Sequence, residues 1–135
     1  MSALRPLLSA LFAALFALPA LAAELVMVEQ AGCSWCTRWN AEIAPAYPKT
    51  PEGRFAPLRR VDLHALPADL ELQRRVVFTP TFLIVEDGQE VGRLEGYPGQ
   101  DFFWPVLDQL LEAHTEFELT PANDDSAAVT PLARF

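Results

Sequence analysis

The chain has 135 residues, enough for one domain, and 10 Lys and Arg against 18 Asp and Glu give it a formal net charge of −8. This acidic balance excludes the usual nucleic-acid-binding proteins, which need a basic face. Hydrophobic residues make up 51% of the sequence, a share that the apolar N-terminus inflates, and a chain of this size can bury a core without covalent staples. Its two cysteines, Cys33 and Cys36, are therefore available for chemistry.

The first 22 residues have the order of a secretory signal peptide. A positive start at Arg5 precedes an apolar run, Leu7–Leu18, and Pro19 is followed by Ala20-Leu21-Ala22 with small residues at the outer positions. The run is shorter than the ~20 apolar residues of a membrane span. An uncleaved anchor and a buried N-terminal helix remain alternatives. We predict a cleaved leader over 1–22 and export to an oxidising compartment, where disulfides persist.

The mature chain alternates predicted strands and helices. Strands are predicted at Glu24–Gln30, Leu58–Leu63, Thr81–Val85 and Glu90–Leu94, and helices from Cys33 through Tyr47, from Pro67 to Gln73 and from Phe102 to His114. Lys49–Pro57 is predicted to be a loop, and Asp87-Gly88 a hairpin turn. This order predicts a layered α/β domain over 23–114, with helices on a mixed sheet. Residues 115–135 are predicted to form a mobile acidic tail.

The motif Cys33-Ser34-Trp35-Cys36 lies where the first strand turns into a helix, and it is the most informative feature of the sequence. A spacing of three puts both sulfurs on one side of the first helical turn. The free N–H groups and the positive dipole end at a helix start favour a thiolate at Cys33, which makes it the expected nucleophile. Cys36 is expected to be more buried and to resolve a mixed disulfide by attacking Cys33.

The sequence gives less support to other functions of the two cysteines. A c-type haem site is excluded, because Thr37 and not His follows the second cysteine. A zinc site would need four ligands, and only His64 and His114 remain as distant partners. A purely structural disulfide would close a very small loop and restrain little chain entropy. A copper chaperone that binds its ion through both thiols is a further alternative. We expect no metal and no organic cofactor.

Several segments together resemble the thioredoxin fold, over about Glu24–His114. They are the first strand, the CSWC helix start, the segment VVFTPTFLIV, the Asp-Gly hairpin and the last helix. The resemblance implies that Pro80 is cis and lies against the cysteine pair. It also implies that the backbone of Thr79 pairs with an extended substrate segment, which brings the partner's cysteine to Cys33. Trp35 either contacts that partner or packs locally.

Within this fold family the chain most resembles the periplasmic thioredoxin-like SoxS proteins of bacterial sulfur-oxidation systems. GCSWCTRWN and LRRVDLH are among the matching segments. The resemblance implies a periplasmic thiol–disulfide oxidoreductase that reduces disulfides or blocked thiols of a sulfur-carrier protein. An inner-membrane thiol carrier would supply the electrons.

The chain departs from the usual thioredoxin pattern at two places, and both affect whether it reduces or oxidises its partner. Met27 stands where thioredoxins usually carry a buried Asp, with Glu29 and Glu42 as nearby carboxylates, and Ser-Trp replaces the usual Gly-Pro between the cysteines. The residues between the cysteines tune the stability of the thiolate and hence the reduction potential. A disulfide oxidase or isomerase therefore remains an alternative.

Overall fold

A mixed four-stranded sheet forms the centre of the computed structural model, which describes residues 23–119. The strand order is β2-β1-β3-β4. β1 (Glu24–Glu29) pairs in parallel with β2 (Leu58–Asp62) and antiparallel with β3 (Thr81–Glu86), and β3 forms a hairpin with β4 (Gln89–Glu95). The predicted α/β class is confirmed, and so are the four predicted strands, whose ends differ from the prediction by about one residue.

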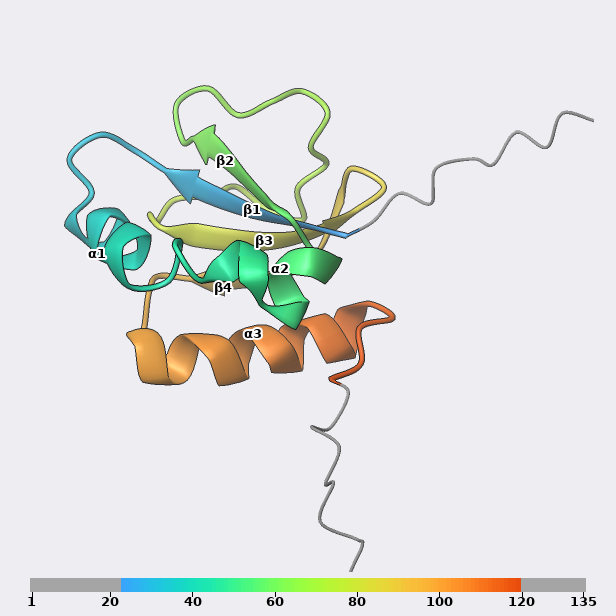
Figure 1. Cartoon of the computed structure of the whole chain (residues 1–135). Coiled ribbons are helices and arrows are strands. Elements are labelled where there is room, and N and C mark those ends of the chain that lie inside the picture. The colour runs from blue at the N-terminus through green and yellow to red at the C-terminus, as the bar shows by residue number, and fades with distance from the viewer. Residues whose placement is uncertain (1–22, 120–135) are drawn as a thin grey trace, which may run out of the picture.

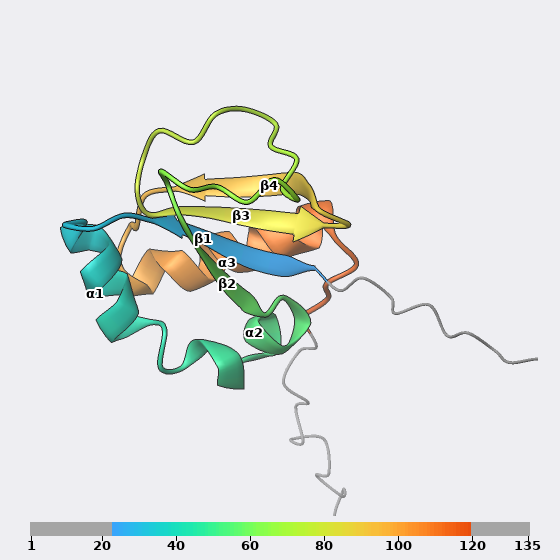
Figure 2. The same ribbon diagram turned by 90° about the horizontal axis from the view of Figure 1, so that it is seen from above.

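Helices cover one face of the sheet, and an irregular crossover covers the other. α1 (Ser34–Glu42) follows β1, the short η1 (Tyr47–Lys49) and α2 (Pro51–Phe55) precede β2, and α3 (Gln100–His114) follows β4. In Figure 1, α2 and α3 lie below the sheet, whereas residues 63–80, which we call the crossover, pass above it. Figure 2 shows α1 at the end of the sheet where β1 ends. Within residues 23–119, no helix is long and apolar enough to span a membrane.

The two central strands are apolar on both faces. In β1, Leu25 and Met27 belong to the core cluster on the helical side, while Val26 and Val28 belong to the cluster under the crossover. β3 has five buried residues in a row. Because both faces are covered, these strands read as continuous apolar runs and not as an alternation of apolar and polar residues.

Trp39 stands at the centre of the core on the helical side. Its side chain is fully buried, and its ring centroid lies 5.1 Å from that of Phe82 and 5.7 Å from that of Phe103. Ile43, one helical turn later, is fully buried as well. The spacing of Trp39 and Ile43 thus gives α1 one apolar face. Packing of that face against the sheet fixes the helix that begins with the cysteine pair.

The segment 49–57, predicted to be a loop, contains α2, so this prediction was wrong. Thr50 caps α2, since its hydroxyl accepts a hydrogen bond from the Gly53 N–H at 3.0 Å, and Pro51 occupies the first turn. Thr-Pro-Glu is a helix-start signal that the loop prediction overlooked. The preceding helix also differs, because α1 ends at Glu42 and does not continue to Tyr47.

The short helix predicted from Pro67 to Gln73 does not form. Instead, Glu71 makes an isolated bridge to Gln89, in which the Glu71 N–H donates to the carbonyl of Gly88 at 2.8 Å. The Glu71 carbonyl in turn accepts the N–H of Glu90 at 2.9 Å. The backbone of the crossover is therefore satisfied by the β3–β4 hairpin and not within a helix. Tertiary contacts override the helix-start signal of Pro67.

The packed part of the chain extends past His114. The Thr115 hydroxyl donates to the carbonyl of Leu111 at 2.6 Å, and Phe117 is buried with its ring 5.1 Å from that of Phe55. This aromatic contact attaches residues 115–117, which the prediction placed in the tail, to α2. The remainder of the predicted tail, 120–135, and the predicted leader, 1–22, lie outside the described residues.

Asp108 on α3 carries a carboxyl group in an unfavourable environment. Within residues 23–119, its Oδ1 is buried without a hydrogen-bond partner. Burial raises the pKa of Asp108 to about 6, and the negative charge of Glu52 adds to this effect. Glu52, on α2, is itself buried. The contact between α2 and α3 thus favours the protonated form of Asp108.

Asp108→Asn should change the pH dependence of stability. Folded Asp108 keeps its proton up to about pH 6, whereas an unfolded Asp loses it near pH 4, so the wild type loses stability from this group as the pH rises through that window. The variant lacks this loss and should be more stable at pH 7 by about 1 kcal/mol, because partial solvation reduces the effect. Urea unfolding between pH 4 and 8 measures the difference. Asp87→Asn, in the exposed hairpin turn, is the control, and a pH-independent difference for Asp108→Asn would contradict this account.

Candidate redox site

The two cysteines form a disulfide at the start of α1. Cys33 is the N-cap residue, and its Sγ accepts a hydrogen bond from the Cys36 N–H at 3.1 Å. The two Cα atoms are 5.2 Å apart. Cys36 is 3% exposed, whereas Cys33 is partly exposed. The sulfur that lies against the free N–H groups of the helix, which favour negative charge, is therefore also the one that a second molecule can reach.

A tight turn between β1 and α1 aims Cys33 at this position. β1 ends at Glu29, and the Cys33 N–H donates to the carbonyl of Gln30 at 3.3 Å. Gly32 in this turn has φ 78°, a conformation that side-chain-bearing residues rarely adopt. The chain can therefore turn within a few residues from the centre of the sheet into the first turn of the helix.

Thr79 and Pro80, which we call the platform, lie at the entry to β3. The peptide bond between them is cis, as the family resemblance implied, and Pro80 is buried while Thr79 is half-buried. The Thr79 hydroxyl accepts a hydrogen bond from Gln30 Nε2 at 2.8 Å. β3 runs antiparallel to β1, so the start of β3 lies beside the end of β1. The fold thereby brings the platform to the same end of the sheet as the cysteine motif.

Trp35, between the cysteines, is 51% exposed. The guanidinium of Arg38 lies 5.5 Å from the centroid of its ring, a distance at which a cation attracts an aromatic face. Arg38 also forms an ion pair with Glu42 at 2.8 Å, and Glu42 accepts a hydrogen bond from the Tyr97 hydroxyl at 2.6 Å. Trp35 thus packs locally against Arg38 while about half of its side chain stays exposed.

The exposed large apolar side chains also include Val77 (57%), Phe78 (60%) and Phe102 (66%). Val77 and Phe78 directly precede Thr79, so they enlarge the surface beside the platform. No sequence motif points to Val77 or Phe78, although an apolar run outside a predicted strand is a usable signal. Phe102 is exposed because Phe103 is the residue of that pair that α3 turns toward the sheet. Exposed apolar side chains near one site favour contact with another molecule.

Met27 occupies the position where the family resemblance would place a proton-accepting carboxylate. It is fully buried, and Arg60 Nη1 lies 3.6 Å from its sulfur. Both nearby carboxylates form ion pairs instead, Glu29 with Arg60 at 3.2 Å and Glu42 with Arg38 at 2.8 Å. The hydrogen bond from Arg38 lowers the pKa of Glu42, which makes it a weaker base. Neither carboxylate takes the usual place beside the buried cysteine.

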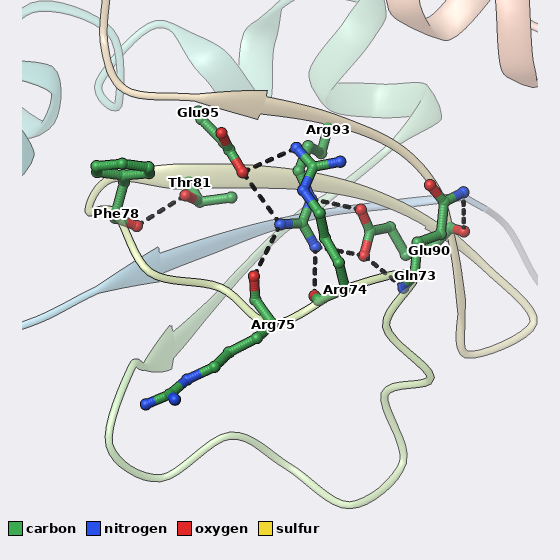
Figure 3. A network of polar contacts seen from close by, with 8 residues as sticks. All are labelled: Gln73, Arg74, Arg75, Phe78, Thr81, Glu90, Arg93 and Glu95. Carbon is green, nitrogen blue, oxygen red and sulfur yellow. Dashed lines mark hydrogen bonds and ion pairs between the residues drawn. The ribbon is translucent and has the colours of Figure 1, made fainter.

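A buried ion pair connects β4 to the crossover (Figure 3). The Arg93 and Glu90 side chains are 5% and 0% exposed and meet at 2.5 and 2.7 Å. Arg93 also donates to the main-chain oxygens of Arg74 at 2.9 Å and Arg75 at 3.4 Å, and Glu90 accepts the Gln73 N–H at 2.9 Å. These two side chains thus supply backbone partners to a stretch that has no helix of its own.

The stretch that Arg93 holds leads directly to the platform. Val76 is buried in the core cluster under the crossover, and the Thr81 hydroxyl donates to the carbonyl of Phe78 at 2.7 Å. The segment between Val76 and Thr81 is therefore attached at both ends. Arg93, 13 to 14 positions after the platform in the sequence, thereby helps to set its position, and no local motif signals this role.

Residues 23–119 contain no group of three or more His, Cys, Asp or Glu side chains that could hold a metal ion. The two histidines contact different elements. Nε2 of His64 lies 3.2 Å from Oε1 of Gln30, and the His114 ring lies near Gly92 on β4. The zinc alternative, which needed both histidines beside the cysteines, does not match this arrangement.

No protein-family model matches the chain, and no curated protein matches it. Among solved structures, it is similar to the periplasmic thioredoxin SoxS from Paracoccus pantotrophus in its reduced form, with 56% sequence identity and a TM-score of 0.65. The match covers 67% of this chain and 96% of that chain. Nearly the whole of that protein is thus represented here.

Replacing Arg93 by Met should destabilise the fold by about 3–5 kcal/mol, because Glu90 would stay buried without its partner. Arg74→Met is the matched control: it removes an exposed ion pair with Glu95 and should cost about 0–1 kcal/mol. Urea unfolding of the oxidised protein measures both. Equal costs would mean that the buried pair does not hold the crossover.

Proposed function

The chain belongs to the thioredoxin family, as a relative of SoxS, and on this premise we propose that it is exported to the periplasm, where it reduces disulfides or blocked thiols of a partner protein. It is a thiol–disulfide oxidoreductase with a thioredoxin fold, which confirms the resemblance stated from the sequence. The observation that carries the proposal is the disulfide at the helix start, with one accessible and one buried sulfur.

The proposed reaction begins with the reduced pair. The Cys33 thiolate attacks a sulfur of the partner's disulfide, whose S–S bond breaks, and the departing partner sulfur takes up a proton. Cys36 then loses its proton and attacks the sulfur of Cys33, which releases the second partner thiol. Two electrons pass to the partner, and the Cys33–Cys36 disulfide forms. An external thiol reductant must return two electrons before the next cycle.

The proton of Cys36 needs an acceptor in the second step. Met27 cannot accept it, and the carboxylates of Glu29 and Glu42 are engaged in ion pairs. In the proposed mechanism the departing partner thiolate or water therefore takes this proton. Cys36 is buried beside apolar residues, where burial disfavours its charged form. Resolution of the mixed disulfide should thus be sensitive to the basicity of the leaving partner.

The partner docks on the surface around Cys33. The main chain of Thr79 pairs with an extended segment of the partner, which adds a short strand at the start of β3. The exposed side chains of Trp35, Val77 and Phe78 then supply apolar contact area beside it. Support for this arrangement is the position of the platform and the cysteine motif at the same end of the sheet.

The proposals for the location, the partner and the electron donor are based on the similarity to SoxS. Its printed name describes a periplasmic thioredoxin, and the leader predicted over 1–22 agrees with export of this chain. We propose a cysteine-bearing sulfur-carrier protein as the partner, whose disulfides or blocked thiols are reduced, and an inner-membrane thiol carrier as the electron donor.

Cys36→Ser should accumulate a mixed disulfide through Cys33, because the attacking sulfur is kept and the resolving one is lost. The reduced variant is mixed with oxidised insulin under non-reducing conditions, and intact-mass spectrometry identifies the adduct. Cys33→Ser is the matched variant and should form no adduct, since Cys36 is buried. Equal adduct formation by both variants would contradict the assigned roles.

The direction of the reaction is tested by the reduction potential of the Cys33–Cys36 pair. A reductant should have a value near that of thioredoxin, about −270 mV, because its disulfide form is then the more stable product. Equilibration with glutathione or dithiothreitol buffers, followed by thiol alkylation, measures it. A value near about −120 mV, typical of strong oxidants, would favour the disulfide oxidase instead.

A further inference from the structure

We propose that Gln30 is a positioning residue, whose side chain holds the platform at a fixed place relative to Cys33. The inference rests on the proposed function, because it concerns the docking of a peptide that carries the disulfide. Such a peptide must bind at two points at once. Its backbone must pair with Thr79 while its sulfur lies in line with the sulfur of Cys33.

Gln30 contacts both parts of the site. Its main-chain oxygen accepts the Cys33 N–H at 3.3 Å, and its side-chain Nε2 donates to the Thr79 hydroxyl at 2.8 Å. Among the described residues, this is the one side-chain hydrogen bond that joins residues 30–36 to residues 76–80. Gln30 therefore links the platform to the cysteine motif across 49 positions of sequence.

His64 orients the amide of Gln30 from the other side. Its Nε2 lies 3.2 Å from Gln30 Oε1, so a ring that carries its proton on Nε2 donates to this oxygen. The His64 main chain is held in turn, since its N–H donates to a carboxylate oxygen of Asp62 at 2.7 Å. Because the amide oxygen faces His64, the amide NH₂ group is directed to Thr79.

This contact is not part of the packed core. Gln30 and Thr79 are half-buried, and neither belongs to the two clusters of buried apolar residues. A single neutral hydrogen bond contributes about 1 kcal/mol, which is small for folding as a whole. Its effect should instead fall on the binding of substrates that pair with Thr79, because this contact fixes the surface to which their backbone binds.

The test compares two disulfides that differ in whether they have a peptide backbone. Insulin can pair with Thr79, whereas 5,5′-dithiobis(2-nitrobenzoate) is a small aromatic disulfide that can only meet Cys33. Gln30→Met keeps the side-chain length and removes both polar contacts. It should raise the KM for insulin about 2- to 10-fold, the equivalent of one neutral hydrogen bond. The kcat with insulin, the rate with the small disulfide and the reduction potential should stay near their wild-type values.

Three further variants separate positioning from a general loss of structure. Gln89→Met is the matched control, since the Gln89 amide binds Glu71 at the exposed hairpin end, and it should behave as wild type with both disulfides. Gln30→Glu can still accept the Thr79 hydroxyl proton and should recover part of the lost insulin affinity. Thr79→Val combined with Gln30→Met should be no worse than the poorer single variant, because the same hydrogen bond is lost.

The outcomes distinguish this inference from the proposed function. An equal loss of activity with both disulfides in Gln30→Met, or additive effects of Gln30→Met and Thr79→Val, would overturn the positioning role and leave the redox function intact. A wild-type protein that reduced neither disulfide would remove the proposed function, and with it this inference.

Discussion

The buried ion pair of Arg93 and Glu90 anchors residues 73–75 of the crossover, the stretch that leads to the redox site. Residues 63–80 contain no helix, so the hydrogen bonds that would hold a helix in shape must come from elsewhere. Arg93 and Glu90 supply several of them from β4. An ion pair buried in this way costs desolvation energy. It persists here because each charge also satisfies backbone groups that no other element reaches.

The site is therefore held from two sides by polar contacts and from below by apolar ones. Arg93 fixes the chain that leads to the platform, and Gln30 connects the platform to the turn before Cys33. Trp39, on α1, is buried against Phe82 on β3 and joins the same two parts of the molecule through the core. A disulfide-exchange site needs these connections, because the reacting sulfur and the surface that receives the partner come from distant segments of the chain and must keep a fixed relative position.

The electrostatic surroundings favour a thiolate at Cys33 more than at Cys36. The start of α1 offers unpaired N–H groups to Cys33, and the Cys36 N–H already donates to its sulfur. Cys36 belongs to the same apolar cluster as Met27, and the carboxylates of Glu29 and Glu42 are engaged in ion pairs. Attack by Cys33 is thus favoured by its surroundings, whereas the second step depends on the partner.

The sequence by itself determined the strands, the mixed α/β architecture and the position of the cysteine pair. Each of these depends on local signals: apolar runs in β1 and β3, a Gly turn, and a spacing of three residues at a helix start. The family resemblance added Thr79 and Pro80, which local signals alone did not distinguish from an ordinary strand entry. Only the tertiary structure decided that the crossover has no helix, that Phe102 is exposed, that Arg93 binds the stretch before the platform, and that Gln30 is hydrogen-bonded to Thr79. These features arise from contacts between residues far apart in the chain, such as the 49 positions between Gln30 and Thr79, and such contacts have no periodicity that a single sequence can display.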